Sequence, residues 1–437
     1  MRRTIPEYES KAVWRLFIYS LILASSYTLS RTAGDSLFLS RIGSESLAAI
    51  YVVSGIVTAL VASIWFALTR RFSLEWSFRA SGIAFSLFTF IAALLLPSFH
   101  HSLWLLAGIY LLADVKGCVN AINVVTAMNQ ILGGHSSREG WARVGLGMPL
   151  AGILIGALIG IEANWVSLRS WLFLSAALDL VGAVSAWHSS KLIVPNNFQF
   201  PRSLDAMASI AERFAHRARE YASSTKFQFW IGCLIATKIA VLTMVSFEWK
   251  LSVHAVYVDD EESLTRFFGV FYAATGVITV LLQAFVAGWL LKRRNIGLSI
   301  LVMPVSLLAF NILFVLGSGM LFLVIVSTLA KAMEVWRRSV HDTALGYLYT
   351  KIKREKRRRA IAWNSGLVKP LSEVSASLIL LFGSGIAHRL TLLAATALWL
   401  ISTFALLRLI RKTQRRKKRT VAFSGNAAVK GEPVEPV

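Results

Sequence analysis

The residues best suited to chemistry form a charged stripe in an otherwise apolar stretch, residues 320–353. The stretch begins as a run able to enter a bilayer, and then carries charges before any loop signal appears. At 3.6 residues per turn, four of these charges share one helix face: Lys331, Glu334, Arg338 and Asp342. Because charge at membrane depth is costly, this face is expected to contact protein or water. The stripe therefore predicts one wall of a polar cavity inside a membrane protein.

Other apolar stretches carry polar residues near their midpoints. Lys116 shares a predicted helix face with Asn120 and Asn123, and Lys238 lies near the middle of residues 227–247. Neither lysine has an acidic residue one turn away, and a buried cation needs a counter-charge. An anionic substrate is therefore expected. The candidate substrate-binding residues are Arg31, Lys116, Asn120, Asn123, Lys238, Lys331, Glu334 and Lys369.

A second group of charges could serve as ion pairs or gates. Three pairs lie one helical turn apart, namely Arg31–Asp35, Arg338–Asp342 and Lys369–Glu373. Asp114 is expected to pair with a neighbouring helix. Residues 337–342 could form a cytoplasmic gate, which leaves Lys331 and Glu334 for substrate contact. For each charge a structural ion pair remains the alternative, because intramembrane charges pair as well as bind.

Length and composition indicate a polytopic helical membrane protein. The chain has 437 residues, of which 56% are hydrophobic. Apolar runs of about 20 residues recur, as in transmembrane helices, whereas the alternating segments of a membrane β-barrel are not seen. The expected spans are 13–33, 47–68, 78–97, 103–132, 144–161, 166–187, 227–247, 267–291, 296–316, 320–350, 360–382 and 386–410.

The net charge of +23 would suggest nucleic acid as a partner in a soluble protein. Here the basic residues cluster in alternate short loops and in the C-terminal tail, whereas an intervening loop reads DDEE at Asp259–Glu262. This pattern follows the positive-inside rule, so both termini are expected in the cytoplasm and no nucleic acid is expected. The first helix lacks a convincing cleavage site, which favours an uncleaved protein of the bacterial inner membrane.

The polar segment 189–225, which contains an amphipathic pattern, divides the spans six and six. The predicted organisation is an N-terminal bundle (1–188), a cytoplasmic linker (189–225), a C-terminal bundle (226–411) and a disordered basic tail (412–437). This is the plan of the major facilitator fold. In that fold the first, fourth, seventh and tenth helices line the cavity, and here these four spans together with the eleventh carry most of the intramembrane charge.

Small residues mark the fifth span. Gly152, Gly156 and Gly160 recur every four residues, a spacing that allows close helix packing. The alternative is a flexible gate around Pro149, and packing is favoured.

Motifs of common enzymes are not found. The sequence has no P-loop, no dinucleotide-binding glycine fingerprint and no HExxH helix, so no catalytic residue, cofactor or metal is expected. The two cysteines, Cys118 and Cys233, lie in apolar segments and suggest neither a disulfide framework nor a zinc site. Asp114, Glu334 or Glu373 could titrate in a cavity, which leaves ion coupling open.

Four stretches resemble the ATP/ADP (nucleotide) transporter family of bacteria and plastids, a branch of the major facilitator superfamily. They are residues 30–55, 133–160, 245–283 and 334–361, and the fourth lacks a proline that the family carries. The resemblance implies a twelve-helix transporter and marks Arg31, Lys116, Lys238, Glu334 and Lys369 as cavity positions.

Three hypotheses follow. The first is a secondary transporter that moves an organic anion by alternating access, such as a nucleotide or another phosphorylated metabolite. The second is a non-transporting scaffold or sensor on the same fold, with the basic tail and linker holding a partner. The third is an ion-coupled transporter of a neutral or lipid substrate. The sequence leaves the oligomeric state open.

Overall fold

The computed structural model describes residues 7–69, 72–131, 143–190, 226–258, 260–287, 296–349, 363–383 and 385–430, and the regular structure within these ranges is helical. The first half comprises α1 (Glu7–Ile42), α2 (Leu47–Thr69), α3 (Leu74–Leu95), α4 (Leu103–Ile131), α6 (Gly147–Glu162) and α7 (Leu168–Ser190). The second half begins with α9 (Lys226–Val256), α10 (Glu261–Leu281), η1 (Leu282–Ala287) and α12 (Ile296–Leu316). It continues with α13 (Met320–Ala332), α14 (Glu334–Trp336), η2 (Arg337–His341), α15 (Asp342–Tyr349), η3 (Asn364–Val368), α17 (Lys369–Phe382) and α18 (Ile386–Lys430).

The apolar spans form as the sequence predicts. Ten described helices are each long and apolar enough to cross a membrane. Two further spans are composite, because π-helical turns divide the tenth into α13 to α15 and precede α17 in the eleventh. The expected class, an all-α polytopic membrane protein with twelve helices in two groups of six, is confirmed.

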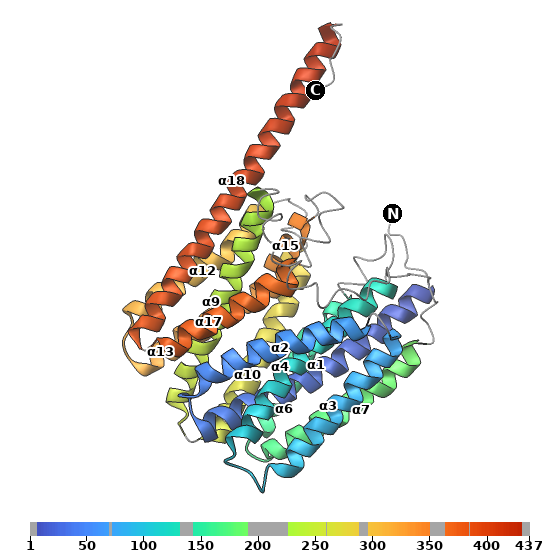
Figure 1. Ribbon diagram of the computed structural model, residues 1–437, viewed down its shortest axis with the longest axis vertical. Helices are drawn as coiled ribbons and strands as arrows, with labels where there is room; N and C mark the ends of the chain where they lie inside the picture. Colours follow the sequence, from blue (N-terminus) through green and yellow to red (C-terminus); the bar gives the residue numbers. More distant parts are fainter. Residues whose placement is uncertain are drawn as a thin grey trace.

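The two halves form two groups of helices that meet along three helix pairs: α6 with α10, α2 with α17, and α1 with α10 (Figure 1). The glycines of α6 make the first of these contacts. A Cβ atom on Gly156 would lie 2.5 Å from the carbonyl oxygen of Gly269 on α10, and one on Gly269 would lie 2.9 Å from the backbone nitrogen of Gly160. Close packing by small residues is therefore confirmed, and it lies between the halves.

A wide turn interrupts the tenth span where its charges gather. The backbone N–H of Asp342 donates to the carbonyl of Arg337, five residues earlier, as in a π-helix. The turn adds one residue to the helical period, and beside it Arg338 pairs with Glu334 whereas Asp342 pairs with Lys238. Such turns are frequent at functional sites.

Helix ends differ from the prediction where polar residues are buried. α1 continues past Asp35 to Ile42, and α9 continues to Val256 rather than ending at residue 247. Contrary to the expected disordered tail, α18 runs on to Lys430 through a segment rich in Lys and Arg, which are good helix formers. Most of the predicted linker, residues 191–225, lies outside the described residues.

Candidate functional site

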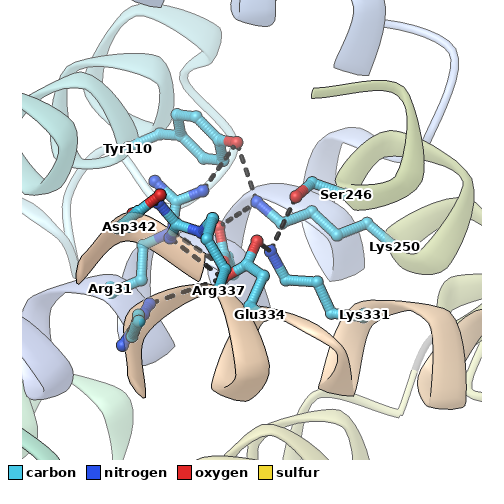
Figure 2. Close-up of polar contacts among 10 residues, drawn as sticks. Arg31, Tyr110, Ser246, Lys250, Lys331, Glu334, Arg337 and Asp342 are labelled. Atoms are coloured by element: carbon cyan, nitrogen blue, oxygen red, sulfur yellow. Dashed lines mark hydrogen bonds and ion pairs between the residues drawn. The ribbon is translucent and has the colours of Figure 1, made fainter. Parts of the chain in front are cut away.

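Charged side chains from both halves meet at one site between α1, α4, α9 and the broken tenth span (Figure 2). We call this set the central cluster. Its members are Arg31, Asp35, Tyr110, Asp114, Lys238, Lys250, Lys331, Glu334, Arg337, Arg338 and Asp342.

Arg31 organises the side of the central cluster that belongs to the first half. Its Nε lies 3.1 Å from Asp35 Oδ2, one turn along α1, and its Nη1 pairs with Asp114 of α4. Its Nη2 also donates to the hydroxyl of Tyr110 at 3.2 Å. The predicted Arg31–Asp35 pair and the predicted pairing of Asp114 with a neighbouring helix are both confirmed. One guanidinium thus holds two carboxylates on two helices.

Lys250 of α9 joins the second half to this side of the central cluster. Its Nζ lies 2.7 Å from Asp35 Oδ1 and donates to the Tyr110 hydroxyl at 2.8 Å. The ammonium also lies 4.7 Å from the centroid of the Tyr110 ring, a cation–π distance. Both charged partners are buried, with exposed side-chain fractions of 2% for Lys250 and 1% for Asp35. Sequence reasoning missed Lys250 because it expected the helix to end before it.

Glu334 organises the opposite side of the central cluster. Its Oε1 lies 2.5 Å from Lys331 Nζ, which also donates to Ser246 Oγ at 2.6 Å. Its Oε2 lies 3.4 Å from Arg338 and 3.8 Å from Arg337. One carboxylate therefore faces three cations, so positive charge is in excess on this side.

Two predictions about ion pairs are corrected here. Asp342 does not pair with Arg338, because Lys238 and Arg337 take its carboxylate, at 2.9 Å from Lys238 Nζ and 3.6 Å from Arg337, while Arg338 pairs with Glu334. Lys238, expected to be unpaired, therefore has a carboxylate partner on another helix, more than a hundred residues away in sequence.

Lys116 is also paired, contrary to the prediction of an unpaired cation in the cavity. Its Nζ lies 2.6 Å from Asp179 Oδ2 of α7, and both side chains are fully buried. Ser30 of α1 and Ser175 of α7 accept hydrogen bonds from the same ammonium at 2.7 and 3.1 Å. The lysine thus binds α4 to α1 and α7 inside the first half.

The predicted amide positions lie in the first half as well. Asn123 accepts a hydrogen bond from Trp65 Nε1 and donates one to Ser81 Oγ, both at 2.9 Å. Asn120 is buried on the same helix. The contacts of Asn123 join α4 to α2 and α3, apart from the central cluster.

Lys369 and Glu373 lie on α17 and do not form the expected ion pair. Lys369 is exposed and Glu373 is half-buried. A lysine placed four residues before a glutamate is the less favourable order for such a helical pair, and Lys369 begins the helix next to Pro370.

A second contact between the halves lies at the end of the molecule away from the two termini. Arg41, near the end of α1, places Nε 2.8 Å from Glu261 Oε2 in the first turn of α10. The pair borders a cavity of about 640 Å³, whose lining also includes His100, Trp165 and Arg169. We call this pair the distal latch.

The fold and the site together define a class. The chain superimposes on a variant of the nucleoside transporter NupG with a TM-score of 0.62 at 14% identity, covering 91% of this chain and 99% of that one. The peptide transporter POT in complex with sulfate gives 0.64 at 13% identity, covering 93% and 95%. A bacterial homologue of the iron transporter ferroportin in the inward-facing state gives 0.59 at 14% identity, covering 91% and 98%. The chain has the fold of these membrane transporters, which is the major facilitator fold.

A family match narrows the class. Residues 157–335 match the family model described as TLC ATP/ADP transporter. These residues include α9 and the first part of the broken tenth span, up to Val335. The resemblance to the nucleotide transporter family is thereby confirmed. No curated protein matches the chain.

Proposed function

We propose that this protein is a secondary transporter that moves an organic anion across the bacterial inner membrane by alternating access. The substrate class is a nucleotide or another phosphorylated metabolite. The observation that carries the proposal is the charge balance of the central cluster. It holds six cationic side chains and only four carboxylates.

The excess of two positive charges has a direct consequence for binding. Buried cations need counter-charges, and the carboxylates present do not supply enough of them. An anion bound beside Lys331, Arg337 and Arg338 would correct the balance. Guanidinium groups suit phosphate because their planar donors match its oxygens. The aromatic rings of Tyr51 and Tyr110 lie beside Lys250, and that of Trp249 lies beside Lys331. Tyr51 is the half-buried one of the three, so its ring is the one on which a base could stack.

Alternating access requires contacts between the halves that can break. The Lys250–Asp35 pair and the distal latch join the halves towards the end away from the termini. The positive-inside pattern of the loops supports an extracellular position for that end. An anion that approaches Lys250 or Arg31 would compete with Asp35 for the same cations. Substrate binding would thereby weaken one contact between the halves.

The nucleotide class rests on two supports. One is the family match over residues 157–335, and the other is the pairing of cations with aromatic faces at one site. NupG, which has the same fold, is a nucleoside transporter, and this agrees with a substrate that carries a base.

The test is uptake into proteoliposomes. Purified protein would be reconstituted and offered labelled ATP, ADP, other organic phosphates and inorganic phosphate, with and without unlabelled substrate inside. We expect saturable uptake of at least one of these anions, lost in Arg337→Gln and retained in Arg79→Gln. Arg79 is a matched control because it pairs with Glu75 on α3, apart from the central cluster. Absence of uptake for every anion, together with no thermal stabilisation of the protein by any of them, would overturn the proposal.

A further inference from the structure

Glu248 and His388 form a buried acid–imidazole contact that the central cluster does not use. Glu248 Oε1 on α9 lies 3.5 Å from His388 Nδ1 on α18, and both residues are buried. Glu248 Oε1 has no hydrogen-bond partner in the described part of the chain. We propose that this pair binds one proton, and that this proton is the coupling ion of the transporter. The coupling role rests on the proposed transport function, whereas proton binding does not.

The hydrogen bonds of His388 carry the first step. Its Nε2 lies 2.9 Å from the carbonyl oxygen of Leu380. A carbonyl only accepts, so Nε2 must carry a hydrogen. In neutral histidine the other nitrogen, Nδ1, then presents a lone pair towards Glu248. If Glu248 were ionised, its Oε1 and the Nδ1 of His388 would be two hydrogen-bond acceptors that face each other in a buried site, with no hydrogen between them.

One added proton resolves this conflict in either of two ways. It can sit on Nδ1, which gives an imidazolium next to a carboxylate, or on Glu248, whose carboxyl then donates to Nδ1. Both arrangements hold one proton more than the pair of neutral histidine and carboxylate. The pair therefore has a protonated form that is satisfied and a deprotonated form that is not, as a proton-binding site requires.

The surroundings of Glu248 keep the site apart from the cations of the central cluster. Asn311 of α12 and Ser327 of α13 line a cavity of about 10 Å³ next to Glu248, near the lower limit for one water molecule. Arg389 of α18 is the other charged residue that acts on Glu248, and its guanidinium donates to the carbonyl of Phe314. Lys331 of α13 faces Ser246 and Glu334 instead. The charges around the pair are thus few.

Position on α9 connects the proton site to the contact between the halves. Glu248 faces α18, Trp249 packs on Phe268 and Phe271 of α10, and Lys250 reaches Asp35 of the first half. Three consecutive residues thus contact three different neighbours. Glu248 is two residues from Lys250, which pairs with Asp35 across the halves, so a movement of α9 would change both contacts together.

The proton site can be tested without any substrate. Infrared difference spectra of the protein in lipid nanodiscs would be recorded through a pH titration. We expect carboxyl and imidazole bands that titrate in the wild type and are lost in Glu248→Gln and in His388→Gln. Glu45→Gln, which alters an exposed carboxylate, is the matched control and should leave these bands unchanged. Spectra of Glu248→Gln identical to those of the wild type would overturn the proposal.

The coupling role has its own readout in proteoliposomes. We expect Glu248→Gln to exchange substrate across the membrane and yet to lose the response of uptake to an imposed proton gradient. Equal uptake by the wild type with and without the proton gradient would overturn the coupling role. Loss of uptake of all anions with retained titrating bands would instead overturn the anion class and leave the proton site standing. Thermal unfolding of each variant shows whether it is folded.

Discussion

Lys250 and Asp35 form a buried ion pair of 2.7 Å that joins the two halves of the protein. Asp35 is shared, because Arg31 holds its other carboxylate oxygen at 3.1 Å. Two cations thus compete for one carboxylate at the boundary between the halves. This arrangement allows the contact to break without leaving Asp35 unpaired, since Arg31 belongs to the same half as Asp35.

The variant Lys250→Gln tests this relationship. It removes the bridge and leaves Asp35 with Arg31, so the contact between the halves should weaken while the first half stays intact. Leaving a buried charge unpaired costs on the order of 2–5 kcal/mol, but Asp35 keeps Arg31 as a partner, so most of this cost is avoided. We expect a large loss of substrate uptake with little loss of thermal stability. The reverse result, stable transport with a much lower melting temperature, would show that the pair is structural only.

The Lys116–Asp179 pair should behave in the opposite way. Lys116→Ala leaves a buried carboxylate without its partner, and such changes destabilise proteins by about 3–5 kcal/mol. The double change Lys116→Met with Asp179→Leu removes both charges and is expected to restore most of the stability. Thermal unfolding in detergent would measure both effects. Substrate affinity should be unchanged in the double variant. A loss of affinity there would show that Lys116 contributes to substrate binding.

Sequence reasoning found the helices and missed several partners, for a physical reason. Apolar runs report membrane spans directly, and spacing along one helix reports pairs such as Arg31–Asp35. Partners on different helices leave no such spacing: Lys116 and Asp179 are 63 residues apart, and Lys238 and Asp342 are 104. The π-helical turn at Arg337–His341 is equally invisible to a period of 3.6 residues. The predicted stripe is therefore present, but its pairing is different.

Close packing of α6 on α10 makes Gly156 sensitive to size. A Cβ atom there would lie 2.5 Å from a backbone oxygen and 2.6 Å from the backbone nitrogen of Ala273, and backbone atoms cannot move aside cheaply. Gly156→Ala is therefore expected to push the halves apart and to abolish uptake. Gly108→Ala is the control, because a Cβ atom at Gly108 on α4 meets no atom within 4 Å. Equal transport by the two variants would show that the α6–α10 contact is not needed.

The start of α10 should give a small pH effect. Hydrogen bonds from Ser263 hold the pKa of the Asp260 carboxyl below its usual range. Because the pKa of Asp260 is lower in the folded state, the cap stabilises the protein fully at pH values above the unfolded-state pKa of about 4. This stabilisation is lost as the pH falls through the folded-state pKa. The difference in melting temperature between wild type and Asp260→Ala should shrink as the pH falls through this window. A difference that grows with falling pH would contradict the capping role.

The distal latch allows a charge-reversal test of gating. Arg41→Glu places a second carboxylate beside that of Glu261, and Glu261→Arg places a second guanidinium group beside that of Arg41. Repulsion between like charges should then hold the latch open in each single variant. The double change Arg41→Glu with Glu261→Arg restores opposite charges at the same positions. We expect uptake to fall in both single variants and to recover in the double variant, measured in the same proteoliposomes. Thermal unfolding of both single variants is the control, because recovery of uptake reports on closure only where the single variants are folded. If the double variant transports no better than either single one, the Arg41–Glu261 contact does not govern closure of this end.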